Sequence, residues 1–276
     1  MSATIGIIGF RGRYGSWLKR FFEARGDLVI GSDKSTPITT EQVIAEADVV
    51  IFAVPIVSTL SVIKEAVPHS QKGQLWMDVT SIKVDPIEEM LRSRAEVVGL
   101  HPLCRPPDGL SMEGHTIVVC YARLSLWRTW VKGFLEGTQA HIRNLEAGPH
   151  DRLMLAEQNL VHLSTLMVAT AMRRMKIPPE KLFDFTTPLS RLVWANVGRV
   201  FSQEPDLYLD IQIHNPETKE MILVCREFLQ DLTVMVEGTT AGRLAFLNEF
   251  VACREYFGEE FLKKAARVFN DTLAKK

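Results

Sequence analysis

The sequence has few cysteines, no long run of charge of one sign and no long apolar run. Its 276 residues include four cysteines, 32 Lys and Arg and 33 Asp and Glu, which gives a formal net charge of −1. Without a basic run, the chain lacks the charge pattern that binds nucleic acid or an anionic membrane surface. The longest apolar run, residues 49–57, is about half of the ~20 residues that cross a bilayer. We therefore expect no nucleic-acid partner and no membrane insertion.

The four cysteines also exclude two kinds of site. They form no C-x-x-C pair and have no histidine at zinc-ligand spacing, so we expect neither a metal site nor a disulfide. Isolated thiols are typical of a reduced compartment. The first residues, Met-Ser-Ala-Thr, lack the basic segment of a signal peptide. These features predict a cytoplasmic protein.

Short apolar runs alternate with helical patterns through the first half of the chain. The strand-like runs are 4–8, 28–31, 48–54, 74–79, 97–100, 116–121 and 140–145, and the helical segments include 12–25, 57–66 and 85–94. Such alternation predicts βαβ crossovers and a mostly parallel sheet. Residues 49–54 are apolar without interruption, as expected for a strand buried on both faces.

The pattern changes near Gly148-Pro149. Beyond this point the sequence predicts long helices at 151–175, 190–202, 217–237 and 242–257, separated by prolines. We therefore predict two domains, an α/β domain over 1–148 and an all-helical domain over 149–276. Amphipathic helices in a domain of this size leave one apolar face over, so we expect a homodimer through the helical domain.

A glycine-rich loop joins the first strand to the first helix. Gly9, Gly12 and Gly15 form G-x-x-G-x-x-G, one residue longer than the usual dinucleotide motif. Glycines at this position let phosphates approach the backbone N–H groups of the helix N-terminus. Asp33 follows the second strand, 18 residues after Gly15, where an acid can bind a ribose 2′-hydroxyl. The alternative is a glycine-rich turn without a cofactor.

The loop and the strand ends predict the cofactor site and favour NAD. A carboxylate at Asp33 would repel the 2′-phosphate of NADP, although Arg11, Arg13 and Lys34 could attract it, so NADP stays possible. The predicted cofactor-binding residues are Gly9, Arg11, Gly12, Arg13, Tyr14, Gly15, Asp33, Val54, Pro55 and Ser81.

A histidine at the end of a strand is the candidate general base. His101 follows the run 97–100, and ligands of open α/β sheets lie beyond the carboxyl ends of the strands. An imidazole can accept the proton of a carbinol while hydride leaves the same carbon. The segment after the preceding strand can present the Ser81 hydroxyl and the Lys83 ammonium at the same edge. Taken alone, such a histidine is more often structural.

Several motifs in one order resemble the prephenate/arogenate dehydrogenases of tyrosine biosynthesis. They are Gly-Leu-His101-Pro-Leu, Asp78-x-x-Ser81-x-Lys83, His150-Asp151 with His162 twelve residues later, Ser190-Arg191 with Val-Gly-Arg199-Val-Phe201, and Gln203-x-Pro205-x-Leu-Tyr208-x-Asp-Ile211. The resemblance covers nearly the whole chain. It implies a Rossmann domain followed by a helical dimerisation domain, and oxidative decarboxylation of a small dianion with hydride transfer to NAD(P).

The resemblance also implies roles for single residues. His101 would take the hydroxyl proton, and Ser81 would hydrogen-bond either His101 or the cofactor. Arg199 would bind the ring carboxylate, since a guanidinium offers a bidentate fork, and His162 would lie near the substrate side chain. Arg191 fits a substrate-binding role and a structural role equally well.

Simpler roles for the residues of the second domain stay open. Arg199 could instead be a buried ion-pair partner of Asp206 or Asp210. His162 could be an ordinary polar residue of a helix. Asp151, at a predicted helix start, fits a cap as well as a functional group.

The sequence departs from the family pattern after His101. Arg105 stands where the family usually has glycine, which implies either an extra cation over the site or a displaced loop. We expect no chorismate mutase segment before the first strand and no regulatory domain after the last helix.

The alternatives to a prephenate dehydrogenase are arogenate or 4-amino-4-deoxyprephenate as substrate, a β-hydroxyacid dehydrogenase, and a non-catalytic nucleotide-sensing protein. The β-hydroxyacid class uses a helix-borne lysine, and residues 151–172 contain none.

Overall fold

A seven-stranded sheet forms the centre of the first half of the chain. The computed structural model describes residues 3–274, so the expectation about a signal peptide rests partly on residues outside it. The strands are β1 Thr4–Ile8, β2 Leu28–Ser32, β3 Val49–Phe52, β4 Leu75–Asp78, β5 Glu96–Pro102, β6 Thr116–Arg123 and β7 His141–Asn144. Their order is β2-β1-β3-β4-β5-β6-β7, and only the pairing of β5 with β6 is antiparallel. Each strand overlaps one of the seven predicted runs, with β2, β5 and β6 longer than predicted, and the strand order confirms the predicted mostly parallel sheet.

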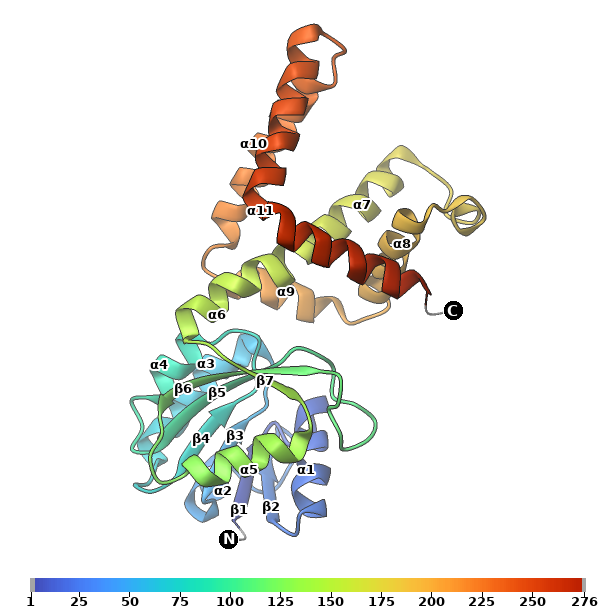
Figure 1. The fold of residues 1–276 in the computed structure, drawn as a ribbon. Helices are drawn as coiled ribbons and strands as arrows, with labels where there is room; N and C mark the ends of the chain where they lie inside the picture. The colour runs from blue at the N-terminus through green and yellow to red at the C-terminus, as the bar shows by residue number, and fades with distance from the viewer. Residues whose placement is uncertain (1–2, 275–276) are drawn as a thin grey trace. The chain divides into compact units, whose positions relative to one another are not determined.

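Helices cover both faces of this sheet (Figure 1). They are α1 Arg13–Ala24, α2 Thr40–Glu46, α3 Ile56–Ala66, the short 3₁₀ turn η1 Val67–His69, α4 Val84–Met90 and α5 Arg128–Thr138. Residues of α1 and α5 pack in one apolar cluster with Val49 and Ile51, whereas residues of α2, α3 and α4 pack in a second cluster with Val50 and Phe52. Consecutive side chains of β3 thus point to opposite cores, which explains why this strand is apolar without interruption.

The remaining elements are helical. They are α6 Ala147–Met154, the π-helix η2 Leu155–Leu160, α7 Val161–Met175, the 3₁₀ turn η3 Leu182–Phe185, α8 Pro188–Phe201, α9 Pro205–His214, α10 Thr218–Met235 and α11 Thr240–Ala274. The continuous helix predicted over 151–175 is therefore wrong in one respect, because a π-helical turn interrupts it. Its position matters for the site described below.

The chain forms two compact units. The first comprises residues 1–162 together with 204–216, and the second comprises 163–203 together with 217–276. Helices α6 and α9 thus belong with the sheet: Asn215, which follows α9, donates a hydrogen bond to the Asp151 carbonyl at 3.0 Å. The boundary predicted at residue 148 stays a prediction.

Residues 3–274 lack two features, one that concerns membranes and one that concerns metal ions. Within this range no helix combines the length and the apolar character that crossing a bilayer needs. No group of three or more His, Cys, Asp or Glu side chains in the same range is arranged so that it could hold a metal ion. All four cysteines are free thiols.

Candidate active site

The glycine loop packs tightly between β1, β3 and the start of α1. Gly9 has φ +87°, and a Cβ there would lie 2.5 Å from the Ala53 carbonyl oxygen. A Cβ on Gly15 would lie 2.1 Å from the Gly9 carbonyl oxygen. Side chains would therefore break the turn, and the first N–H groups of α1 receive no side-chain cap from Gly12. An uncapped helix N-terminus behind a glycine turn fits a pyrophosphate.

Asp33 lies beside this loop at the end of β2. Its Oδ2 accepts a hydrogen bond from the Arg11 N–H at 3.1 Å, and its Oδ1 accepts one from the Lys34 N–H at 2.8 Å. The Arg11 guanidinium donates to the Ser35 hydroxyl at 2.7 Å. The structure thus brings Asp33 together with the predicted loop residues. Val54 and Pro55 follow β3 on the same edge, and Val54 lies next to Gly9.

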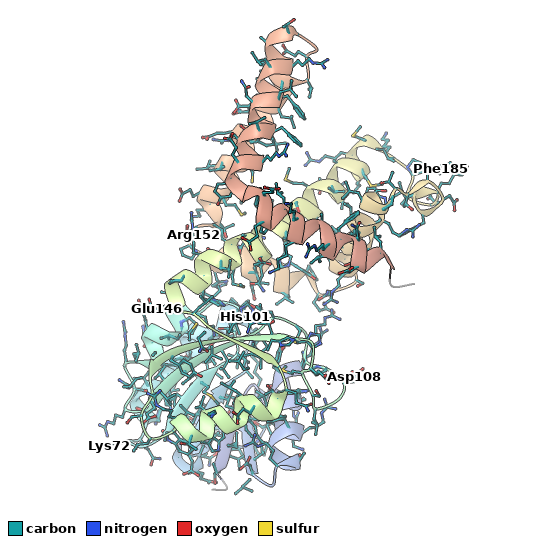
Figure 2. The ribbon with its side chains drawn as sticks, in the orientation of Figure 1. Lys72, His101, Asp108, Glu146, Arg152 and Phe185 are labelled. Atoms are coloured by element: carbon teal, nitrogen blue, oxygen red, sulfur yellow. The ribbon has the colours of Figure 1, made fainter. Side chains whose placement is uncertain are left out.

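Tyr14 connects the nucleotide loop to the loop after His101. Its hydroxyl donates to the Cys104 carbonyl, and burial raises the pKa of this phenol far above its usual value. Trp17 Nε1 donates to the Gly109 carbonyl at 2.9 Å, and Arg20 donates to the Asp108 carbonyl at 3.0 Å. Figure 2 labels Asp108, an exposed residue of this loop. Helix α1 therefore anchors residues 104–109, the segment that contains Arg105 in place of the family glycine. Arg105 itself is exposed.

His101 lies near the carboxyl end of β5, beyond the point where β4 stops. The last paired residues of β4 and β5 are Asp78 and Gly99, so His101 extends two residues past this pairing and pairs with Val118 of β6. The side chain is buried, with 2 % of its surface exposed. The structure thus places the predicted base at the sheet edge where ligands of such folds bind.

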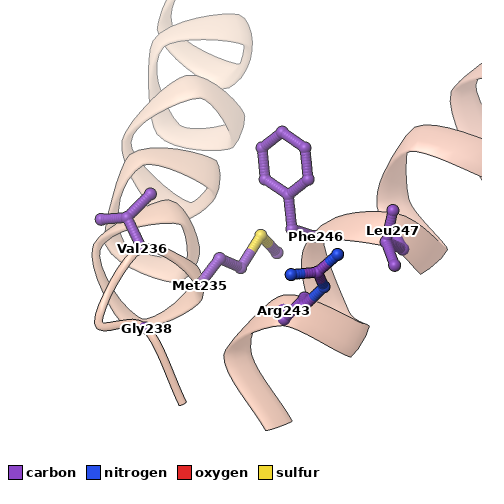
Figure 3. Close-up of a pocket in the computed structure, with 6 residues that line it drawn as sticks. All are labelled: Met235, Val236, Gly238, Arg243, Phe246 and Leu247. Atoms are coloured by element: carbon purple, nitrogen blue, oxygen red, sulfur yellow. The ribbon is translucent and has the colours of Figure 1, made fainter. Parts of the chain in front are cut away.

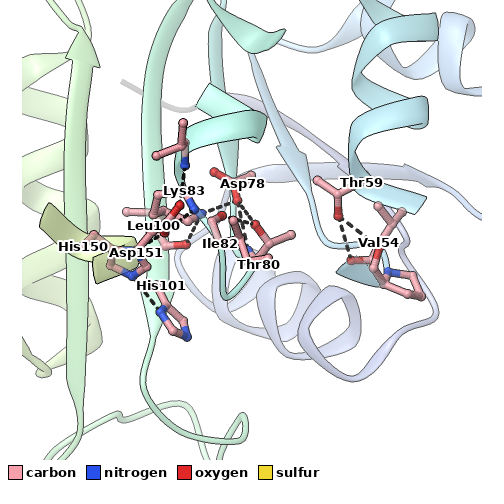
Figure 4. Close-up of polar contacts among 12 residues, drawn as sticks. Val54, Thr59, Asp78, Thr80, Ile82, Lys83, Leu100, His101, His150 and Asp151 are labelled. Atoms are coloured by element: carbon pink, nitrogen blue, oxygen red, sulfur yellow. Dashed lines mark hydrogen bonds and ion pairs between the residues drawn. The ribbon is translucent and has the colours of Figure 1, made fainter. Parts of the chain in front are cut away.

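The His101 ring has hydrogen-bond partners on both nitrogens. Its Nδ1 lies 2.9 Å from Nε2 of His150, and Nδ1 of His150 lies 2.6 Å from the Asp151 carboxylate (Figure 4). The Nε2 of His101 lies 3.4 Å from the side-chain amide nitrogen of Gln158. The pKa of His101 is well below its usual value because burial, His150 and Lys83 all disfavour the imidazolium. His101 is therefore a neutral imidazole near pH 7.

One prediction about the β4–α4 segment needs correction. The Lys83 ammonium is not at the edge: its side chain is fully buried, forms an ion pair with Asp78 and donates to the Leu100 carbonyl at 2.9 Å. Its aliphatic stem runs beside β5, where a Cβ on Gly99 would lie 3.1 Å from it. Ser81 is half-buried after β4, but the hydrogen bonds of His101 come from His150 and Gln158. A role for Ser81 toward the cofactor stays a prediction.

The other predicted substrate residues fall in different units. His162 begins α7 in the first unit, where its ring packs edge-to-face on Tyr208 with centroids 4.7 Å apart. Burial lowers the pKa of His162, and its Nδ1 has no hydrogen-bond partner among residues 3–274. Arg191 and Arg199 are exposed on α8 in the second unit.

Sequence reasoning missed Gln158 and left Asp151 undecided. Gln158 lies in η2, and π-helical turns are rare and frequent at functional sites. A helical pattern in sequence does not reveal such a turn. Asp151 is indeed a cap, but of a helix far away in sequence: its carboxylate accepts the Lys83 and Val84 N–H groups at the start of α4, at 2.8 and 3.0 Å.

The fold and the site define a class: a nucleotide-binding α/β domain with a buried neutral histidine at its ligand edge, followed by helices, as in a dinucleotide-dependent dehydrogenase. Residues 25–142 match the family model for the prephenate dehydrogenase nucleotide-binding domain, and residues 146–249 match the model for the prephenate dehydrogenase dimerization domain. The chain belongs to the prephenate dehydrogenase family.

Individual relatives agree with this assignment. The T-protein of Haemophilus influenzae is 30% identical over 95% of this chain and 70% of its own length. A probable arogenate/prephenate dehydrogenase of Methanocaldococcus jannaschii is 28% identical over 93% of this chain and 61% of its own length. The fold is similar to that of the Aquifex aeolicus prephenate dehydrogenase crystallised with hydroxyphenyl propionate and NAD+, with a TM-score of 0.69, 16% identity and coverage of 100% and 99% of the two chains.

These findings confirm the predicted family, the α/β-plus-helical fold class and the nucleotide-binding character of the first domain. They identify the chain as an oxidoreductase and decide against a β-hydroxyacid dehydrogenase and a non-catalytic nucleotide sensor.

Proposed function

We propose that this protein converts prephenate to 4-hydroxyphenylpyruvate by oxidative decarboxylation, with NAD as hydride acceptor. Hydride leaves the ring carbinol carbon for the nicotinamide, the bond to the ring carboxylate breaks and carbon dioxide departs. The electron pair of that bond aromatises the ring, so the hydroxyl oxygen ends as a phenol. Aromatisation makes the step strongly downhill, and the site mainly has to position the reactants.

The observation that carries this proposal is the neutral His101 at the ligand edge of the sheet. Gln158 directs an amide N–H toward Nε2, so this nitrogen is the acceptor of the ring. Nε2 can take the hydroxyl proton as hydride departs and return it to the oxygen when the ring becomes aromatic. The overall reaction then neither consumes nor releases a proton. A lowered pKa keeps His101 ready for this role below pH 7.

The nucleotide loop supports NAD as the cofactor. Gly9, Gly12 and Gly15 leave room for the pyrophosphate at the N-terminus of α1, and Asp33 offers its carboxylate to the ribose hydroxyls. Arg11, Arg13 and Lys34 lie on the same loops and leave NADP as an alternative. The same edge contains Val54, Pro55 and Ser81 as further contacts.

The substrate contacts are proposed on charge. A dianion needs fixed cations, and Arg199, with Arg191 as a second candidate, supplies guanidinium groups for its carboxylates. His162 favours prephenate over arogenate, because a half-buried imidazole with a lowered pKa suits a keto acid, whereas a carboxylate would suit the amine of arogenate. Arogenate and 4-amino-4-deoxyprephenate are the alternative substrates.

We propose a homodimer through the helices of the second unit. Large apolar side chains of α11 stay about half exposed or more, among them Leu244, Leu247, Phe250 and Val251. Between α10 and α11 a hollow of about 400 Å³ is lined by Met235, Val236, Gly238, Arg243, Phe246 and Leu247 (Figure 3). Exposed apolar surface of this kind marks an interface, and the matched dimerization-domain model, over residues 146–249, includes the residues that line this hollow. The predicted cytoplasmic location stays a prediction.

One experiment tests the function directly. Purified protein is assayed with prephenate, arogenate and 4-amino-4-deoxyprephenate, each with NAD and NADP, by the absorbance of the reduced nicotinamide. We expect the highest kcat/KM with prephenate and NAD. His101→Asn should lower kcat by about 10²–10⁴-fold while nucleotide affinity is retained, and the exposed His141→Asn is the matched control. Full turnover by His101→Asn would refute the role of this residue.

A further inference from the structure

His150 and Asp151 follow one another on the Nδ1 side of the His101 ring, away from Nε2, the proposed base nitrogen. His150 and Asp151 are 0% and 6% exposed and belong to α6, in the same unit as His101. Figure 4 shows them in a row with His101, each within hydrogen-bond distance of the next. Burying three titratable side chains together costs folding free energy unless their polar atoms pair as donor and acceptor, which requires a defined place for each hydrogen.

The hydrogen positions in this row follow from the backbone of α4. Asp151 Oδ1 accepts the Lys83 N–H and Oδ2 accepts the Val84 N–H, and a backbone N–H can only donate. Both carboxylate oxygens are therefore acceptors. The 2.6 Å contact with Nδ1 of His150 then needs a hydrogen on that nitrogen.

The same reasoning extends to His101. The Gln158 amide nitrogen, 3.4 Å from Nε2 of His101, can only donate, so the lone pair of the neutral His101 ring is on Nε2 and its hydrogen is on Nδ1. Nε2 of His150 then accepts the hydrogen from Nδ1 of His101. This agrees with the hydrogen that the Asp151 carboxylate requires on Nδ1 of His150.

We infer that His150 and Asp151 are positioning residues that hold His101 in the tautomer with its lone pair on Nε2, the atom that receives the substrate proton. The effect of this tautomer on catalysis rests on the proposed function, whereas the tautomer itself follows from the hydrogen bonds alone. The N-terminus of α4 fixes the Asp151 carboxylate, Asp151 fixes the tautomer of His150, and His150 fixes His101. In the other tautomer, His101 would present an N–H to the substrate hydroxyl and could not act as a base.

Amide substitutions separate this role from simple packing. Asp151→Asn keeps the shape but can accept on only one side-chain atom, so His150 and His101 can change tautomer. We expect kcat to fall by about 10²–10⁴-fold with KM nearly unchanged, because both residues act through His101. His150→Gln retains an acceptor for Nδ1 of His101 and should lose about tenfold at most, whereas His150→Leu should lose at least as much as Asp151→Asn.

The matched control is Asp85→Asn. Asp85 lies in the first turn of the same helix α4 but is exposed, so its charge is lost at the same helix end without a link to His150. We expect its kcat within about twofold of the parent. Equal losses in His150→Gln and His150→Leu would indicate packing alone and overturn the inference.

A spectroscopic measurement tests the tautomer without any substrate. Nitrogen-15 spectra of protein labelled in its histidine rings distinguish a protonated from an unprotonated ring nitrogen, and His101→Asn assigns the signal. We expect an unprotonated Nε2 on His101 in the parent protein and in Asp85→Asn, and loss of that single state in Asp151→Asn. An unchanged tautomer in Asp151→Asn overturns the inference even if its activity falls. If the protein turns over none of the three cyclohexadienyl acids, the proposed function fails, but the tautomer result still decides the inference.

Discussion

The buried ion pair between Lys83 and Asp78 can be used to test what holds the carboxyl ends of β4 and β5 together. Lys83 and Asp78 are both fully buried, and Lys83 also binds the Leu100 carbonyl, one residue before His101. Asp78 Oδ2 accepts two further hydrogen bonds from Thr80, while Oδ1 has no partner among residues 3–274. Removing the ammonium therefore leaves a fully buried carboxylate without its ion-pair partner.

Lys83→Met removes the cation and nearly preserves the side-chain volume. Breaking a buried pair from one side costs about 3–5 kcal/mol. In a domain of 150–250 residues, each kcal/mol of lost unfolding free energy lowers the thermal unfolding midpoint by roughly 2–4 °C, so we expect Tm to fall by about 6–20 °C. Adding Asp78→Asn removes the unpaired charge but retains an oxygen for Thr80, so the double variant should recover about 2 kcal/mol or more of the loss.

Urea unfolding followed by tryptophan fluorescence measures these differences, since Trp76 lies on β4 itself. The matched control is Lys132→Met, which removes a lysine from the exposed ion pair with Glu136 on α5 and should cost about 1 kcal/mol or less. If Lys83→Met costs no more than Lys132→Met, or if the double variant is less stable than Lys83→Met, Lys83 does not neutralise Asp78 in the folded protein.

The pH dependence of activity should follow the protonation of His101. Because burial, His150 and Lys83 lower its pKa, kcat/KM should stay constant as the pH falls to 6.5 and decline only at lower pH. The unfolding free energy should fall with pH below 6.5, since the unfolded chain then binds a proton that the folded His101 does not; an apparent pKa at or above 6.5 in the pH–rate profile would contradict this. Asp33→Ser should raise KM for NAD by about tenfold and improve the NADP to NAD ratio, whereas an unchanged KM would place Asp33 outside the site. Leu247→Glu with Phe250→Glu should give a folded monomer in sedimentation, and a persistent dimer would show that this face is not the interface.

Much of the first unit follows from local sequence. Each strand is a short β-rich or apolar run, and β3 has no polar position because both of its faces are covered. The glycine loop was predictable because its backbone passes so close to Ala53 and Gly9 that side chains cannot fit. His101 was placed correctly because a strand followed by His-Pro ends at the carboxyl edge of a parallel sheet.

Residues whose partners are distant in sequence were not predictable in this way. Lys83 was expected at the edge because its spacing after β4 allows it. In the structure its aliphatic stem packs beside Gly99, and its ammonium pairs with the Asp78 carboxylate in the core. The sequence left Asp151 open between a cap of its own helix and a functional group, and the structure shows that it caps α4, 67 and 68 residues earlier. Gln158 could not be selected, because a π-helical turn has no clear signature in a helical pattern.

The amino-acid sequence by itself determined the strands, the nucleotide loop, the position of His101 at the sheet edge and the family, because each depends on neighbours within a few residues or on motifs in a fixed order. Only the tertiary structure decided which nitrogen of His101 is free to accept a proton. That choice depends on hydrogen bonds from α4 through α6 to β5, and a hydrogen bond forms between groups that folding brings together, whatever their separation along the chain.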